Sequence, residues 1–425
     1  MDAQRHSLRQ IFTILLFAPL SALGSPLSFE DAIQETTRSN ADLQAARENL
    51  RSNEALSQGA YNGFLPTLNG NLGTTWSNTL GASTPYTSGS SATATLNQNL
   101  FSGFQDELRL KQAKKSEVLS QILLRITKAK ISADLKASYS NLYYSQKGIE
   151  LAHAIALRRE ENLHLVELRF ESGRENKGSV LLSKAYHADS RLSELQAKNG
   201  FNSAQTQLAK ILGRPNSVSS FETLEAKEQP PFLPAPAANI DLRSLAAATP
   251  EHEQAIVKEE LAQNTLSASY SAFYPSLNFS GSLGTQGTGY SLGTERWSAG
   301  LTLSFPLFGG FKDYFAAKSS AALFLAASQN RLSVDQELLT RIQQAYSNFI
   351  EAIEKKKVDD LFYEAALTRA QIAREKYNNG LLTFEDWDVI ENDLIVREKA
   401  RLQSAQNQFQ TEAAWEQVLG KGVIR

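Results

Sequence analysis

The sequence predicts a mainly helical chain of two duplicated halves, in which four amphipathic strands belong to a membrane β-barrel and long helices pack lengthwise beside it. Three observations predict this: a very long run without glycine or proline, an alternating apolar and polar segment just before it, and the recurrence of both. The run spans 311–379 and the alternation 297–307. A helix of that length is roughly 100 Å long, whereas ordinary globular helices have about 10 to 14 residues. It must therefore pack along similar helices.

Composition narrows the possible functions. The 425 residues carry a formal net charge of −2, with no strong charge run, so nucleic-acid binding is not indicated. The chain has no cysteine, which excludes disulfides, thiolate metal sites and a lipidated N-terminal cysteine. Its five histidines lack metal-ligand spacing, and no catalytic Ser/His/Asp set or phosphate-binding loop is recognisable. We therefore expect no enzyme activity, no cofactor and no metal site.

Residues 1–24 have the pattern of a secretory signal peptide. Arg5 and Arg9 precede an apolar run, 11–20, and small residues around Ala22 and Gly24 offer a cleavage site. No later run reaches the roughly 18 apolar residues that a membrane helix needs. The protein is expected to leave the cytoplasm, and any insertion into a membrane must use strands.

The first half, 25–215, is predicted to begin with two helices and then to form a hairpin and two long helices. The expected ranges are 29–38 and 41–63 for the first helices, about 67–77 and 92–101 for the strands, about 104–172 for the long helix, and 176–212 for the last helix. The strands alternate weakly apolar and polar residues, which is typical of a two-faced sheet. Gly213 and then Pro215 end the last helix.

The second half, 240–425, follows a proline-rich linker, 216–239, and repeats this plan. We expect strands at about 276–286 and 296–308 and a long helix at about 311–379. Heptad spacing relates Leu325, Leu332, Leu339, Tyr346 and Ile353 in that helix. A second apolar row beside the heptad favours neighbours on two sides, and a two-helix coil with a wide seam is the alternative.

The duplication keeps one register over more than a hundred residues. Phe101 and Phe308 are 207 residues apart, and so are the glycines expected to end the two long helices, Gly173 and Gly380. Helices commonly end at such a left-handed residue. Further glycines, Gly103, Gly309 and Gly310, lie at the junctions from strand to long helix. Chance similarity would not keep the same offset over so many residues.

Four strands cannot close a barrel, and an open sheet edge is not tolerated in lipid. The chain is therefore expected to oligomerise. Three copies would supply twelve strands around a polar lumen, with Trp76 and Trp297 near the edge of the lipid-facing band. A soluble four-stranded sandwich is the alternative.

The strand ends 99–104 and 306–311, together with the turn 377–380, resemble those of the outer membrane efflux proteins, the TolC family. The resemblance covers essentially the whole chain after the signal. It implies a homotrimer in the outer membrane of a Gram-negative bacterium, with a 12-stranded barrel in the lipid and a 12-helix tunnel holding most of the mass in the periplasm. Substrate would pass passively, without a catalysed reaction.

The resemblance also implies partners. A tripartite efflux or type I secretion system pairs such a channel with a periplasmic adaptor, or membrane fusion protein, and an inner-membrane transporter of the RND, ABC or MFS type. The substrate does not follow from the sequence. A periplasmic coiled-coil tether or scaffold without a pore is the alternative function, although it leaves the two hairpins unexplained.

The family's entrance residues carry over in part. Tyr377 matches a tyrosine that ties the closed entrance, but Leu382 stands where an arginine is expected. Asp386 matches the first of two pore-constricting aspartates, while Val389 replaces the second and Asp388 lies next to it. Helical geometry separates Asp386 from Asp388 by about 200°, so both cannot face the lumen.

Asp386 also has a local explanation. Thr383 and Asp386 have the spacing of a capping box at the start of a helix. Such a role does not exclude a lumenal one, and we favour Asp386 as the residue that forms a ring of three carboxylates.

Overall fold

The computed structural model describes residues 26–78, 86–214, 224–236, 240–289 and 292–424, so the expected signal peptide lies outside the described residues. The first half contains α1 (Phe29–Ser39), α2 (Ala41–Gly59), a 3₁₀ turn (Ala60–Phe64), β1 (Thr67–Asn78), β2 (Tyr86–Phe101), α3 (Gln105–Glu171) and α4 (Lys177–Leu212). The second half contains α5 (Leu242–Ala247), α6 (Pro250–Ser269), a 3₁₀ turn (Tyr270–Phe273), β3 (Ser276–Thr288), β4 (Thr294–Ser304), α7 (Lys312–Asn378) and α8 (Phe384–Val418).

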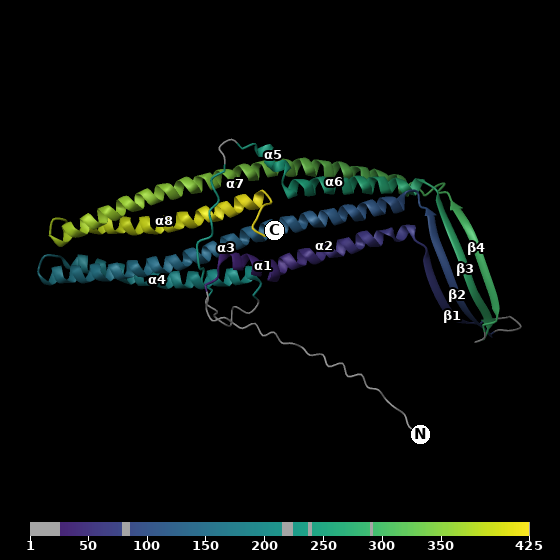
Figure 1. Cartoon of the computed structure of the whole chain (residues 1–425), viewed down its shortest axis with the longest axis horizontal. Coiled ribbons are helices and arrows are strands. Elements are labelled where there is room, and N and C mark those ends of the chain that lie inside the picture. Colours follow the sequence, from purple (N-terminus) through teal and green to yellow (C-terminus); the bar gives the residue numbers. More distant parts are fainter. Residues whose placement is uncertain (1–25, 79–85, 215–223, 237–239, 290–291, 425) are drawn as a thin grey trace, which may run out of the picture.

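The molecule is elongated, with the sheet at one end and the helix tips at the other (Figure 1). The 67-residue helices α3 and α7 each run from the sheet to a tip, and α4 and α8 return beside them. Near the sheet, α2 packs along α3, and α6 packs along both α3 and α7. Helix α3 therefore has neighbours on two sides. The two apolar rows were predicted in α7, which packs against α5, α6 and α8 of the same chain. Packing of α7 against a further neighbour stays a prediction.

The sheet is antiparallel, with the order β1-β2-β3-β4. Its register places apolar residues opposite one another, such as Leu68 opposite Leu96 and Leu283 opposite Trp297. Side chains alternate between the two faces along each strand, so these residues gather on one face. The two hairpins, which are far apart in the sequence, form one continuous amphipathic sheet.

Two strand ends differ from the predicted ranges by more than two residues. Strand β2 begins at Tyr86 rather than near residue 92, because residues 87–91 pair with β1 and residues 89–91 also pair with β3. This segment is polar on both faces, so it gives no alternation to detect. Strand β4 ends at Ser304 rather than at 308. Pro306 follows two residues later and has no N–H group for a ladder.

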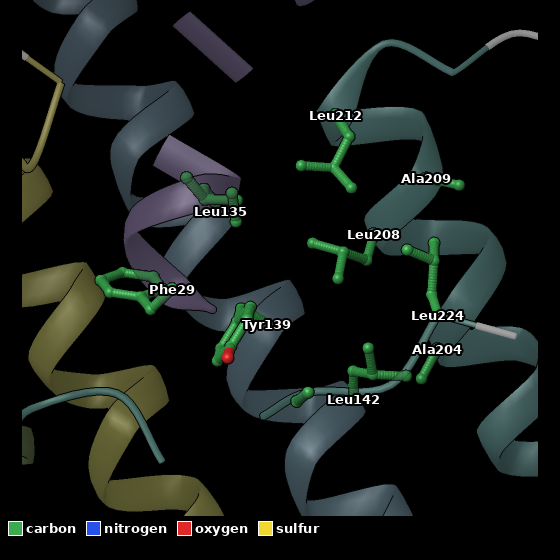
Figure 2. Close-up of a cluster of buried hydrophobic side chains, with 11 residues drawn as sticks. Phe29, Leu135, Tyr139, Leu142, Ala204, Leu208, Ala209, Leu212 and Leu224 are labelled. Atoms are coloured by element: carbon green, nitrogen blue, oxygen red, sulfur yellow. The ribbon is translucent and has the colours of Figure 1, made fainter. Parts of the chain in front are cut away.

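Each half has its own core near the middle of the helices. In the first half, Figure 2 shows side chains of α1, α3 and α4 directed toward one another around Leu135 and Leu208, which are completely buried. The Phe29 ring meets the Tyr139 ring edge-on at 5.2 Å. The second half has a matching cluster at positions 207 residues later, and two of three matched pairs have a larger side chain there. The matched pairs are Leu135 and Ile342, Leu142 and Phe349, and Leu208 and Trp415.

The linker crosses the helices and joins the two halves (Figure 1). Residues 228–236 form neither helix nor strand. The Phe232 ring stacks on Phe409 at 3.9 Å, and the Leu233 N–H donates to Glu412 at 2.9 Å. Glu412 also accepts a hydrogen bond from buried Lys136 of α3. Burial raises the pKa of Glu412, and the ion pair with Lys136 and the hydrogen bond from the Leu233 N–H act in the opposite direction.

Candidate functional site at the helix tips

Both tips end their long helices in the same way. Gly173 and Gly380 each have a φ of +72°, in the left-handed region. The Gly380 N–H donates to the Tyr377 carbonyl at 3.0 Å, and the Leu381 N–H donates to Lys376 at 2.8 Å. The first tip has the equivalent pair of bonds at Gly173 and its successor. This two-bond pattern is the Schellman motif, which satisfies carbonyls at a helix end. Both glycines therefore lie in the turns that the sequence predicts.

The returning helices begin at side-chain caps. The Asn176 side chain accepts from the Ser179 N–H at 3.0 Å, and Thr383 Oγ1 accepts from the Asp386 N–H at 3.1 Å. The Thr383 hydroxyl in turn donates to the Asp386 carboxylate at 2.8 Å. The predicted cap at Thr383 is present. Asp386 is nevertheless exposed, so its carboxylate can also meet solvent.

Tyr377 is the centre of a buried cluster that joins the two tips. Its side chain is 0% exposed, and its ring stacks on Trp387 at 4.3 Å with the two planes 10° apart. Phe384 of α8 meets both rings, while Val166 and Val180 contribute from α3 and α4. Residues of both helical hairpins, α3–α4 and α7–α8, therefore bury the aromatic pair Tyr377 and Trp387.

Two charged residues of the first helical hairpin contact Tyr377. The Arg169 Nη1 donates to the Tyr377 carbonyl at 2.6 Å, and its guanidinium lies 4.4 Å from the centre of the Tyr377 ring. The Tyr377 hydroxyl donates to Glu175 Oε2 at 3.1 Å. Burial, and then the Glu175 carboxylate, raise the pKa of Tyr377. The tyrosine therefore stays protonated at neutral pH and keeps its donor role.

The two candidate aspartates lie in different surroundings. Asp388 is only 9% exposed, lies 3.6 Å from Arg159 in an ion pair, and accepts from the Tyr186 hydroxyl at 3.1 Å and from Asn392 at 3.0 Å. These contacts bind α8 to α3 and α4. Asp386, about half a turn away, is exposed. Of the two, Asp386 is the carboxylate that is exposed on this chain, and Asp388 is buried.

A second layer of charge lies farther from the tip. Arg158 of α3 donates to both carboxylate oxygens of Glu398, at 3.1 and 2.6 Å, and its Nε lies 2.7 Å from Glu391. Glu391 is buried. Removing one member of a buried ion pair leaves an uncompensated charge, which is strongly destabilising. This layer therefore holds α3 and α8 together behind the tip.

At the other end of the molecule, the apolar face of the sheet is open. Trp76 is 67% exposed and Trp297 is 79% exposed, and both lie on this face with Leu72 and Leu301. Soluble monomers rarely expose a continuous apolar patch of this extent. The face requires an apolar environment, and the two tryptophans lie in its half farther from the helices.

The junctions between strand and helix use consecutive left-handed residues. Gly103 and Phe104 have φ values of +63° and +69°, and Gly310 and Phe311 have +63° and +64°. Such a conformation is unusual for phenylalanine. The Phe104 ring meets Phe101 at 5.2 Å and Tyr274 at 5.5 Å, both edge-on. Gly309 precedes the second pair with φ outside the left-handed region.

No group of three or more metal-binding side chains occurs in the part of the chain that the structure describes. Over the same residues, no helix combines the length and the apolar character needed to cross a membrane.

Sequence reasoning missed Arg169 and Glu175. Neither position was singled out at the entrance, and both lie in the first half, more than 200 residues from Tyr377. The one available signal was Leu382. Because an expected arginine was missing there, a cation elsewhere near the tip was a reasonable candidate for its role.

The family model for outer membrane efflux proteins matches residues 32–214 and 242–421, which are the two halves. The alkaline protease secretion protein AprF of Pseudomonas aeruginosa is 24% identical over 328 residues, which is 75% of this chain and 65% of AprF. The match thus spans slightly less than two thirds of that relative.

Solved structures share the fold. The outer membrane channel MtrE of Neisseria gonorrhoeae, in an open state, superposes with a TM-score of 0.79 at 17% identity, covering 93% of this chain and 89% of MtrE. The CmeC outer membrane channel of Campylobacter jejuni has a TM-score of 0.82 at 14% identity, covering 93% and 86%. The long helices and the four-stranded sheet are thus the fold of these channels. The family match covers most of both halves, and the chain belongs to the outer membrane efflux protein family.

Proposed function

We propose that three copies of this chain form an outer-membrane channel that passively conducts substrate from the periplasm to the outside. The observation that carries the proposal is the exposed apolar face of the sheet, which ends in two free edges. Among the described strands, β1 and β4 each have a neighbour on one side only. In lipid these edges need partners, and β4 of one copy can pair with β1 of the next.

The helices support the same closure. Helix α7 packs against α5, α6 and α8, and on its remaining surface Leu323, Leu325 and Leu361 are more than half exposed. At the opposite edge, Leu181 and Leu195 of α4 are also more than half exposed. Apolar side chains on both outer helices favour a ring of copies, in which α7 meets the α2 and α4 edge of its neighbour.

In this proposal the tips form the periplasmic entrance. Tyr377, Arg169 and Glu175 hold the two hairpins of each chain together, and Asp386 contributes one carboxylate per chain to a ring around the pore. Three close carboxylates repel one another and create a site for multivalent cations. The strand end with Trp76 and Trp297 faces the outside.

The channel works, in this proposal, with a periplasmic adaptor and an inner-membrane transporter, and it catalyses no reaction. A channel of this kind can serve either efflux or type I secretion. The similarity to AprF, which is named for protease secretion, supports the second, while MtrE and CmeC are described only as outer membrane channels.

Three measurements test the proposal. The protein should stay with outer membranes through a carbonate wash, have the mass of a trimer by light scattering in mild detergent, and give stepwise conductance in planar bilayers. A periplasmic tether or scaffold would be released by the wash and would give no steps. A monodisperse monomer with intact β-structure would rule out the trimeric barrel.

A further inference from the structure

We propose that Arg296 forms the only charged ring of the barrel lumen, near its outer mouth, and makes this exit selective for anions. The inference rests on the trimeric barrel proposed above. It adds a residue that determines specificity at the end of the channel opposite the entrance.

The hairpins are almost free of charge. Residues 65–104, which include β1 and β2, contain no aspartate, glutamate, lysine, arginine or histidine. Residues 275–311, which include β3 and β4, contain one acid and one base, Glu295 and Arg296. Any fixed charge of the barrel wall must therefore come from these two neighbours.

The strand register separates the two charges. Trp297 pairs with Leu283 and Leu301 pairs with Phe279, which marks the odd-numbered residues of β4 as the apolar face. The Ser298 hydroxyl lies 2.8 Å from the Ser282 hydroxyl, which marks the even-numbered residues as the polar face. Since successive side chains point to opposite faces, Arg296 belongs to the polar face and Glu295 to the apolar one.

The position along the strand places Arg296 at the exit. Strand β4 begins at Thr294 and ends at Ser304, where the chain turns toward α7. Arg296 is thus two residues from the end of the strand that is remote from the helices (Figure 1). Three copies would bring three guanidinium groups to one level of the lumen.

No opposite charge faces this ring. Arg296 lies opposite Gly284, and β1, the strand next to β4 in a closed barrel, contains no charged residue. The other lumenal side chains are serine, threonine, asparagine and glutamine. Rings of arginine favour anions in pores, and walls of low dielectric constant strengthen the field in a cleft. The exit should therefore favour anionic solutes over cations of similar size.

Ion selectivity tests this assignment, and Glu295 supplies a matched control. The reversal potential of single channels would be measured under a tenfold KCl gradient, in an Asp386→Asn background that removes the proposed entrance ring. We expect Arg296→Gln to lower the chloride-to-potassium permeability ratio by roughly twofold or more at low salt. Arg296→Lys should keep the parent ratio, because it keeps the charge. Glu295→Gln, on the lipid-facing side, should also keep it.

Salt provides a second readout. The Debye length is about 30 Å at 0.01 M and about 3 Å at 1 M, so the effect of Arg296→Gln should shrink as salt rises. A ratio unchanged by Arg296→Gln in channels that still conduct would overturn the inference and leave the trimeric channel standing. A permeability ratio that changes only in Glu295→Gln would also overturn the inference, because it would show that Glu295 faces the lumen and Arg296 the lipid. If the parent protein gives no conductance steps, the proposed function itself fails.

Discussion

The two helix tips have the same backbone and different surfaces. The positions of Gly173 and Gly380 agree in dihedral angle and in hydrogen bonding, yet the residues around them diverge. Phe170 is 42% exposed, whereas its counterpart 207 residues later, Tyr377, is fully buried. Leu181, 59% exposed, matches Asp388, which is buried in an ion pair. At these two positions the first tip presents apolar side chains outward, whereas the second tip buries its side chains inside the chain.

This difference shows how a duplication can specialise. The turn needs only a glycine and a cap, so both copies keep them. The side chains around the turn then became complementary, because the first copy supplies Arg169 and Glu175 and the second supplies Tyr377. Without these complementary contacts each helical hairpin would be independent, whereas here Arg169 and Glu175 connect the first hairpin to Tyr377 of the second.

The largest effect should come from emptying the buried site of the second tip. Replacing a fully buried aromatic residue by alanine typically lowers the free energy of unfolding by about 3 to 5 kcal/mol. Tyr377→Ala should therefore loosen both helical hairpins and raise single-channel conductance. Hydrogen exchange of amides in 160–180 and 370–392 would measure the loosening. Phe170→Ala, at the matching exposed position, is the control and should change exchange far less. Equal effects of the two changes would contradict the asymmetry of the tips.

Arg169→Gln should have the next largest effect. It removes a hydrogen bond from a charged group, worth about 1.5 to 3 kcal/mol, and also the cation over the Tyr377 ring. The expected result is faster exchange at both tips and more frequent open states in planar bilayers. Arg174→Gln, which removes the same charge from an exposed position of the same tip, should leave gating unchanged. If both arginine variants gate alike, net charge rather than the contact with Tyr377 is responsible.

The two glycines should respond equally to substitution. A left-handed backbone costs a residue with a side chain about 1 to 2 kcal/mol, and no atom lies within 4 Å of a Cβ added at either position. Gly173→Val and Gly380→Val should therefore lower the melting temperature of the trimer by similar amounts and disturb efflux. Gly200→Ala, inside α4 with ordinary φ and open space, should be neutral or stabilising. Unchanged melting and efflux in both valine variants would show that these turns do not need glycine.

The smallest effect on stability and the sharpest effect on conduction should come from Asp386→Asn. The exposed carboxylate receives one hydrogen bond from the Thr383 cap, a local role worth about 1 kcal/mol. A trivalent cation added from the periplasmic side should block the parent channel and fail to block this variant. Asp388→Asn should lower stability more, because Asp388 is buried with Arg159, and should leave the block intact. Block that is lost only in Asp388→Asn would place the pore on the other side of α8.

Much of the fold could be predicted because it depends on local patterns. A proline-free run interrupted only by Gly148 predicted α3, and a run free of both proline and glycine predicted α7, each to within two residues at either end. Alternation predicted the strands wherever one face was apolar. It failed at residues 87–91, where threonine, serine and glycine leave both faces without apolar side chains and only pairing with β1 and β3 makes a strand. The C-terminal end of β4 was misjudged because alternation continues past the point where Pro306 stops the ladder.

The candidate site was less predictable. Tyr377 and Asp386 came from a resemblance at single positions, and the helical angle showed that Asp386 and Asp388 face different ways. Which of the two is buried depended on Arg159 and Tyr186, which come from other helices. No local pattern contains that information.

The sequence by itself determined the duplication, the long helices, the turns at Gly173 and Gly380 and the alternation of the hairpins. Each of these follows from backbone preferences and from periodicity within a few neighbouring residues. Only the tertiary structure decided that Arg169 and Glu175 hold Tyr377, that Asp388 is buried, and that the two hairpins join into one sheet. These contacts connect residues about 200 positions apart, and their energy depends on distances and burial that exist only after the halves have packed together.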